Sequence, residues 1–165
     1  MTIINDNLIL CGLQSGQFEL IDMRVASSVF HSTSTEAETH GALSAISTSS
    51  HSGNLLATGS TKGVVGLYDV RFLSSSSLSS LVTFRRNEAG IEDLCFMNLD
   101  NDDLGLAIAT GDGLPFVAEV SSGGSQVKVG AELAGVDCDP VRAVRTRGRD
   151  VWCASDDAIV RKWSL

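Results

Sequence analysis

The chain has 165 residues, of which 43% are hydrophobic and 19% charged, a balance that excludes a largely disordered protein. Twenty acidic residues against twelve basic ones give a net charge of -8, which disfavours binding to nucleic acid phosphates or anionic lipid and favours basic protein surfaces. No apolar run approaches the length of a membrane span, and the N-terminus lacks the cationic region of a signal sequence. We therefore expect a cytoplasmic and nuclear protein that binds neither nucleic acid nor membrane.

The residues that commonly carry chemistry are scattered. The four cysteines lie far apart without a C-x-x-C pair, so zinc and dithiol chemistry lack the spacing they need. The three histidines fall in the first third of the chain, and neither a G-x-S-x-G elbow nor an H-E-x-x-H pair accompanies them. We expect no catalysis, no cofactor and no metal; a serine hydrolase is the third-ranked alternative, because a triad is defined in space.

Apolar residues occur in short runs separated by Gly, Ser, Asn and Asp, a pattern that predicts an all-β fold. In chain order, a first unit at Asn7–Arg24, NLILCGLQSGQFELIDMR, aligns without a gap with Asn54–Arg71, NLLATGSTKGVVGLYDVR, 47 residues further on. Looser copies follow at Gly105–Val120 and Asp150–Leu165. Each copy reads as strand, turn and strand, and the turns centre on Gly16, Gly63, Gly113 and Ala158.

Further strands are predicted between the copies, at Ser28–His31, Ala42–Ser47, Leu81–Phe84, Ile91–Met97, Val127–Leu133 and Val141–Arg145. Four short strands per period of about 45 residues is typical of a β-propeller blade, which is covered by a neighbour on each face. Two covered faces would explain why LILCG, LLATG and LAIAT lack polar alternation.

The predicted architecture is about three and a half four-stranded blades of a seven-bladed ring, in one partial propeller spanning 1–165. The predicted blades are 1–32, 40–85, 89–133 and 139–165. An open arc leaves blade faces and strand edges uncovered. We therefore expect Met1 to be an internal start, with upstream residues supplying the fourth strand of the last blade.

The third strands of the first two units end in Ile21-Asp22 and Tyr68-Asp69, and the last unit ends in Lys162-Trp163-Ser164-Leu165. These endings resemble the Trp-Asp dipeptide of the WD-repeat family. The third unit has Ala118-Glu119-Val120 instead, and His40 and Gly41 stand in reversed order relative to the family's turn.

The segment Glu132–Pro140, ELAGVDCDP, and the unit that follows it resemble the last blade of the proteasomal ATPase-associated factor family. That resemblance implies a chaperone of proteasome regulatory-base assembly, which binds the C-terminal domain of one ATPase subunit. The alternative is a general WD-repeat scaffold, such as a ubiquitin-ligase substrate adaptor or a ribosome-assembly factor.

Binding residues are expected on the loops of one rim of the propeller. The candidate partner-binding residues are all acidic: Glu88, Asp112, Asp137, Asp139, Asp156 and Asp157. Structural alternatives remain open, because Asp156 would also cap a turn and the run from Asp100 to Asp103 fits a hairpin turn. The serine-rich run from Ser74 to Ser80 fits a spacer or a phosphorylated loop.

The basic residues gather near the C-terminus, at Arg142, Arg145, Arg147, Arg149, Arg161 and Lys162. We expect them to pair with nearby acids. A nucleic-acid stripe is the less favoured interpretation, because few aromatic residues lie between them and the chain is acidic.

Overall fold

The computed structural model describes residues 1–25, 27–31, 40–49, 54–72, 80–99, 104–121 and 123–165. The described residues form four antiparallel sheets, here called blades 1 to 4. Blade 1 holds β1 (Thr2–Asn5), β2 (Leu8–Gly12), β3 (Phe18–Asp22) and β4 (Ser27–His31). Blade 2 holds β5 (Leu43–Thr48), β6 (Leu55–Ser60), β7 (Val64–Asp69) and β8 (Val82–Arg85), with a short 3-10 helix at Val70–Phe72.

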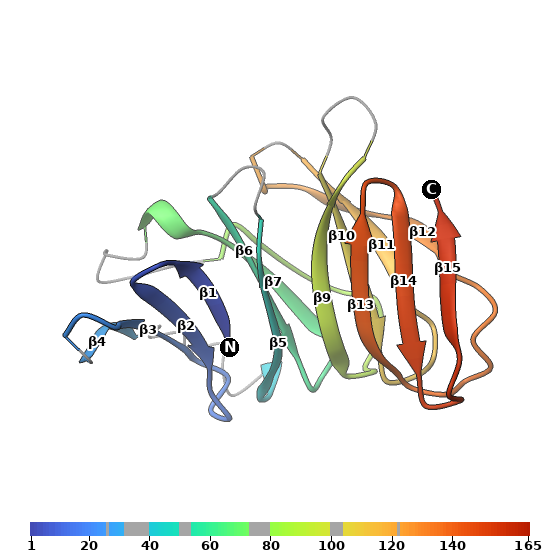
Figure 1. Ribbon diagram of the computed structural model, residues 1–165, viewed down its shortest axis with the longest axis horizontal. Coiled ribbons are helices and arrows are strands. Elements are labelled where there is room, and N and C mark those ends of the chain that lie inside the picture. Colours follow the sequence, from blue (N-terminus) through green and yellow to red (C-terminus); the bar gives the residue numbers. More distant parts are fainter. Residues whose placement is uncertain (26, 32–39, 50–53, 73–79, 100–103, 122) are drawn as a thin grey trace.

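Blade 3 holds β9 (Ile91–Asn98), β10 (Leu104–Thr110), β11 (Phe116–Val120) and β12 (Val127–Glu132). Blade 4 has three strands, β13 (Val141–Arg147), β14 (Asp150–Ser155) and β15 (Val160–Ser164). Within each blade the strands follow chain order. The blades succeed one another along the longest axis of the molecule, from blue at blade 1 to red at blade 4 (Figure 1). The all-β prediction is therefore confirmed.

The first strands of neighbouring blades pack together, β5 on β9 and β9 on β13. Polar side chains join them: the Ser44 hydroxyl donates to the Ile91 carbonyl. Asp93 Oδ2 accepts from the Val144 N–H at 3.0 Å, and the Thr146 hydroxyl donates to the Phe96 carbonyl at 2.8 Å. These bonds satisfy polar groups between apolar blade faces, where an unpaired group is costly.

Burial differs between inner and end blades because only inner blades have two neighbours. Every residue of β6 and of β10 is buried. In blade 1, by contrast, β2 buries only Leu10 and β3 alternates between buried and half-buried residues. The two-faced covering predicted for LLATG and LAIAT is confirmed, whereas that for LILCG is wrong, because only Leu10 of β2 is buried and none of the described strands covers the other face of blade 1.

The Asp-x-Arg sequences that end the third strands of blades 1 and 2 form the same ion pair. Arg24 folds back onto Asp22, with its N–H on Oδ1 at 2.9 Å and its Nη2 on Oδ2 at 2.5 Å. Arg71 binds Asp69 in the same way, at 2.9 and 2.6 Å. The Arg24 hydrogen bonds lower the pKa of Asp22 from 3.8 to about 2.

The six strands predicted between the repeat copies are confirmed within one or two residues. The predicted turn centres all adopt positive φ: 82° at Gly16, 75° at Gly63, 76° at Gly113 and 62° at Ala158. β1 has no counterpart among the predicted strands. The run from Asp100 to Asp103, His51 and nearly all of the serine-rich run lie outside the described residues.

Candidate functional site

The lower edge of the molecule in Figure 1 carries the turns between second and third strands and the loops that lead into first strands. We call this edge the lower rim. One backbone hydrogen bond recurs there in blades 2, 3 and 4. It joins the turn after the second strand to the residue just before the first strand of the same blade. The N–H groups of Thr61, Gly111 and Asp156 donate to the carbonyls of Ala42, Gly90 and Pro140, at 2.9, 2.9 and 3.0 Å respectively. The repeated bond fixes the loops of the lower rim to the blades.

All six predicted acidic residues lie on this rim, and contacts link their loops in sequence. The loop of Glu88 meets the turn of Asp112, because Asn87 Nδ2 donates to Asp112 Oδ2 at 2.6 Å. That turn meets the loop of Asp137 and Asp139, since a Cβ at Gly113 would lie 2.8 Å from the Asp139 carbonyl oxygen. The structure thus brings the predicted residues onto one edge.

Asp112 is engaged in the structure of its own turn. It accepts from Asn87, from the Leu114 N–H at 3.2 Å and from Arg86 Nη2 at 3.3 Å. Burial alone would raise the pKa of Asp112, but these hydrogen bonds and the Arg86 charge hold it below its ordinary value. Arg86 is itself fixed, with its guanidinium 4.5 Å from the centre of the Phe116 ring. Asp112 therefore stabilises the β10–β11 turn.

The structure gives the turn-capping role, an alternative considered for Asp156, to its neighbour Asp157. Asp157, not Asp156, caps the β14–β15 turn: it accepts from the Ile159 N–H at 2.9 Å and pairs with Arg161 at 2.5 Å. Asp156 instead pairs with Arg142 at 2.8 Å, and Arg142 reaches Glu92 of blade 3 at 3.0 Å. The alternative in which Asp156 caps the turn therefore does not hold, because the Ile159 N–H donates to Asp157, the residue next to the positive-φ Ala158.

Three acidic residues of the rim, Glu88, Asp137 and Asp139, differ from Asp112, Asp156 and Asp157 in having no partner for their carboxylates among the described residues. Glu88 and Asp137 are exposed and Asp139 is half-buried. Within the described part of the chain, their carboxylates make no hydrogen bond or ion pair. Cys138 between the two aspartates has a φ of 61°, and its backbone packs against Gly113. A backbone fixed in this way presents Asp137 and Asp139 in one orientation.

Most of the basic residues near the C-terminus are paired, as expected. Besides the pairs of Arg142 and Arg161, Arg145 binds Asp93 at 2.5 Å and Lys162 binds Asp150 at 2.8 Å. The Asp93 contact crosses from blade 4 to blade 3, and sequence reasoning missed it because only the packing of β9 on β13 brings the two residues together.

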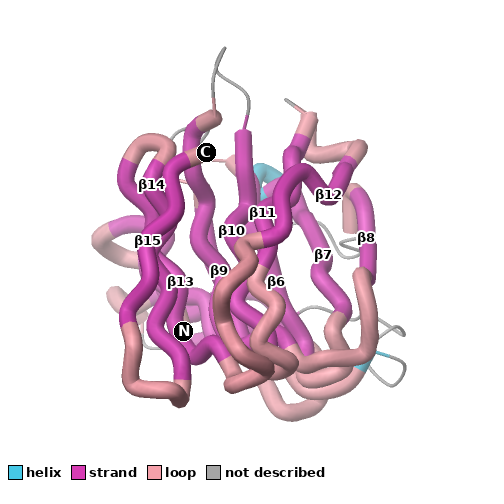
Figure 2. The backbone as a smooth tube through the Cα atoms, turned by 90° about the vertical axis from the view of Figure 1, so that its right-hand side faces the viewer, coloured by secondary structure: helices cyan, strands magenta, loops and turns pink. Residues whose placement is uncertain are grey.

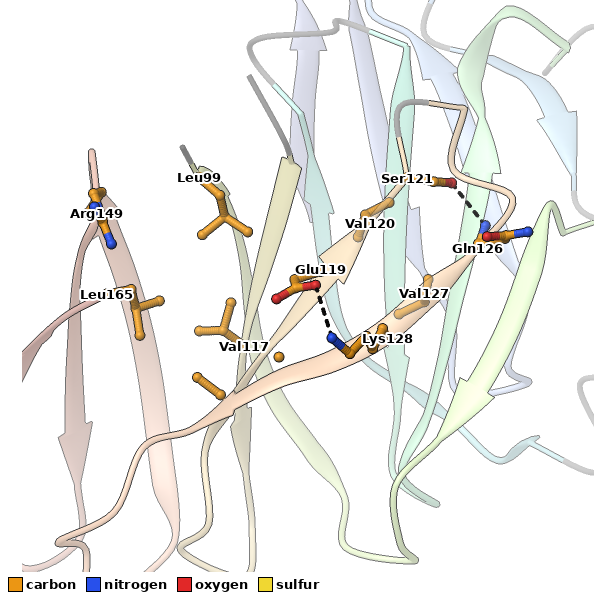
Figure 3. Close-up of a pocket in the computed structure, with 12 residues that line it drawn as sticks. Leu99, Val117, Glu119, Val120, Ser121, Gln126, Val127, Lys128, Arg149 and Leu165 are labelled. Atoms are coloured by element: carbon orange, nitrogen blue, oxygen red, sulfur yellow. Dashed lines mark hydrogen bonds and ion pairs between the residues drawn. The ribbon is translucent and has the colours of Figure 1, made fainter. Parts of the chain in front are cut away.

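A second candidate site lies at the opposite edge, here called the upper rim, between blades 3 and 4. It is a cavity of about 670 Å³ between β11 and β12 on one side and the end of blade 4 on the other. Figure 3 shows Val117, Glu119 and Lys128 on one wall and Leu165 with Arg149 facing them. The only charged contact drawn there is the Lys128–Glu119 pair, whose nitrogen and oxygen are 3.8 Å apart.

Among the residues that the structure describes, no group of three or more His, Cys, Asp or Glu side chains could hold a metal ion. In the same residues there is no helix of the length and apolarity that a membrane crossing requires.

Comparison with known proteins defines the architecture. No family model matches the chain, and no curated protein matches it. Among solved structures 885 chains match, including the crystal structure of the computationally designed Ika4 protein. That match covers 98% of this chain and 87% of the other, with a TM-score of 0.71 and 15% sequence identity. The chain is thus an arc of four β-propeller blades, an architecture so widely shared that it does not select a function.

Proposed function

We propose that this chain is a protein-binding propeller arc that holds a basic partner surface against its lower rim. The observation that carries the proposal is the set of unpaired carboxylates of Glu88, Asp137 and Asp139 on loops fixed by backbone bonds. A rigid surface loses little conformational entropy on binding, and unpaired carboxylates steer a basic partner toward it.

For the identity of the partner, we propose the C-terminal domain of one proteasomal ATPase subunit, with a role in assembly of the regulatory base. This proposal rests on the likeness of Glu132–Pro140 and the unit after it to the proteasomal ATPase-associated factor family. Two residues of that segment, Asp137 and Asp139, belong to the rim, so both lines of support meet at one place. The alternative proposal is a scaffold or substrate adaptor that uses the same rim for another basic partner.

The test is capture of the six isolated ATPase C-terminal domains by the immobilised chain at moderate salt. We expect one domain to be retained and Asp137→Lys to release it. The matched control is Asp6→Lys, which makes the same charge change at an exposed turn between β1 and β2, on the upper rim. Retention of none of the domains by the folded chain would exclude the proteasomal partner, and equal effects of both variants would exclude the rim.

A further inference from the structure

We propose that four exposed, small or apolar residues of the lower rim form the centre of its partner site and take a basic segment with one apolar side chain in its middle. The four are Leu114, Ala134, Gly135 and Cys138, here called the apolar patch. This inference rests on the proposed function and adds to it the contact that selects the partner. Figure 2, seen from the side of blade 4, shows the loops gathered along this lower edge of the molecule.

The apolar patch is built from two segments that are bonded to each other at the junction of blades 3 and 4. The Leu133 N–H donates to the Pro115 carbonyl at 2.9 Å. Leu114 and Ala134 are the sequence neighbours of these two bonded residues. The turn before β11 and the loop after β12 therefore contribute to one stretch of the rim.

The loop after β12 is anchored so that part of the patch faces outward. Leu133 and Val136 are 2% and 8% exposed, and both pack into the apolar cluster between blades 3 and 4. The residues beside these two anchors, Ala134, Gly135 and Cys138, are exposed. Because the backbone of the loop also packs against the β10–β11 turn, little conformational entropy is lost when a partner covers them.

Leu114 is exposed at a position that is buried in the neighbouring blade. It follows Gly113 in the β10–β11 turn, as Val64 follows Gly63 in the β6–β7 turn. Val64 is 8% exposed, whereas Leu114 is 50% exposed. Blades 2 and 3 each lie between two other blades (Figure 1), so this difference does not arise from the ends of the arc. Covering such a side chain with an apolar group of a partner removes apolar surface from water and stabilises the complex.

Unpaired carboxylates border the patch. Those of Glu88, Asp137 and Asp139 make no hydrogen bond or ion pair within the part of the chain that the structure describes. Two of them stand on either side of Cys138 in the sequence, and the loop of Glu88 is hydrogen-bonded to the β10–β11 turn. Protein interfaces commonly have an apolar centre and a polar border. A negative border favours lysine or arginine on both sides of the apolar side chain of the partner.

The same border disfavours a second copy of this chain as the occupant. Two copies joined about a two-fold axis through the patch would bring Asp137 and Asp139 of both chains to one interface. Like charges brought together across an interface cost free energy. The charges therefore select a basic partner over self-association.

The test uses the whole chain and two capped nine-residue peptides, in which leucine or serine stands between two runs of four lysines. Amide chemical shifts of the labelled chain give both the site and the affinity. We expect the leucine peptide to bind at least about fivefold more tightly than the serine peptide and to shift the amides at 113–115 and 133–138.

The peptide pair separates this inference from the proposed function. Equal affinity of the two peptides for the lower rim would overturn the apolar contact and leave the basic partner standing. If neither peptide binds the lower rim in a salt-dependent way, both the inference and the proposed function are wrong.

A change at Leu114 separates apolar contact from charge. Leu114→Asp adds a carboxylate to an acidic rim, so it would strengthen binding of the leucine peptide if charge alone mattered. We expect it instead to weaken that binding at least about fivefold, and to leave the serine peptide bound no less tightly. Tighter binding of both peptides would overturn the proposal.

Matched variants control for charge and folding. Val129→Asp makes the same change at a valine that is 40% exposed on β12, and we expect it to change neither affinity by more than about twofold. Ala134→Asp is a second change within the patch and should act like Leu114→Asp; thermal melts establish that each variant is folded. If sedimentation of the chain alone shows a dimer that Leu114→Asp dissociates, a second copy covers the patch and the proposal is wrong.

Discussion

Ala158 occupies the turn position that is glycine in the other three repeat copies, with a φ of 62°. A left-handed conformation costs an alanine about 1–2 kcal/mol. Glycine avoids this cost, but its greater conformational freedom in the unfolded chain offsets part of the gain in stability. We predict that Ala158→Gly raises the free energy of unfolding by about 0.5 kcal/mol, measured by urea denaturation.

The matched change at the equivalent turn should have the opposite sign. A Cβ at Gly113 would lie 2.7 Å from the Cys138 carbonyl carbon, in addition to the cost of its φ of 76°. We expect Gly113→Ala to lower the free energy of unfolding by at least about 2 kcal/mol. A destabilising Ala158→Gly would show that the alanine methyl makes a contact that outweighs its backbone strain.

The Asp22–Arg24 pair predicts a pH dependence. The folded pKa of Asp22, about 2, lies below its ordinary value of 3.8, so folding favours the charged carboxylate. The stabilisation is complete above pH 3.8 and is lost as the pH falls toward 2. The difference in unfolding free energy between the wild type and Asp22→Asn should therefore shrink over this range. A constant difference for Asp22→Asn would contradict the ion pair.

At the scale of elements, the contact between blades 2 and 3 depends on a close approach at Gly59 of β6. A Cβ there would lie 2.4 Å from Ile91 Cγ2 and 2.8 Å from Ile91 Cβ. Both atoms lie close to the β9 backbone, so they cannot move aside without shifting that strand. We predict that Gly59→Ala destabilises the protein by about 1–3 kcal/mol.

Ile91→Ala removes the nearer atom and should recover part of this loss. The double variant is then less destabilised than the sum of the two single variants, which a double-mutant cycle by denaturation measures. Strict additivity would mean that the two blades do not approach as closely as the structure has them.

The strands and turns were predictable because they recur: two segments that align without a gap at an offset of 47 residues place the Asp-x-Arg ends and the glycine turns in register. What sequence could not supply was contact between distant residues. The Arg145–Asp93 pair joins residues 52 apart, and the choice of Asp157 over Asp156 as the cap depends on which carboxylate reaches the Ile159 N–H. The cavity beside β15 had one sequence signal, the third strand that closes the last repeat copy, but its walls follow only from the packing of β11 and β12.

At the scale of the whole molecule, the two ends of the arc differ in chemistry. On the free face of blade 1, Ile3 pairs across the sheet with Ile9, and Ile9 with Ile21, and Ile3 is 65% exposed. The free face of blade 4 carries the charged Lys162 and Arg147 beside Val160, which is 68% exposed. An apolar exposed face binds hydrophobic dyes, so we predict that Ile3→Ser lowers the fluorescence of bound anilinonaphthalene sulfonate. Val160→Ser, a matched change at the other end of the arc, should have a smaller effect; the reverse order would contradict the assignment of faces.

Binding at the lower rim is the central claim, and it is tested most directly by amide chemical-shift mapping of the labelled chain with the captured ATPase C-terminal domain. We predict chemical-shift changes at 86–90 and 137–140, with further changes at the turns 111–113 and 155–158. We also predict that binding weakens as the salt concentration is raised. Shifts confined to the upper rim or to the free face of blade 1, or binding that is indifferent to salt, would contradict it.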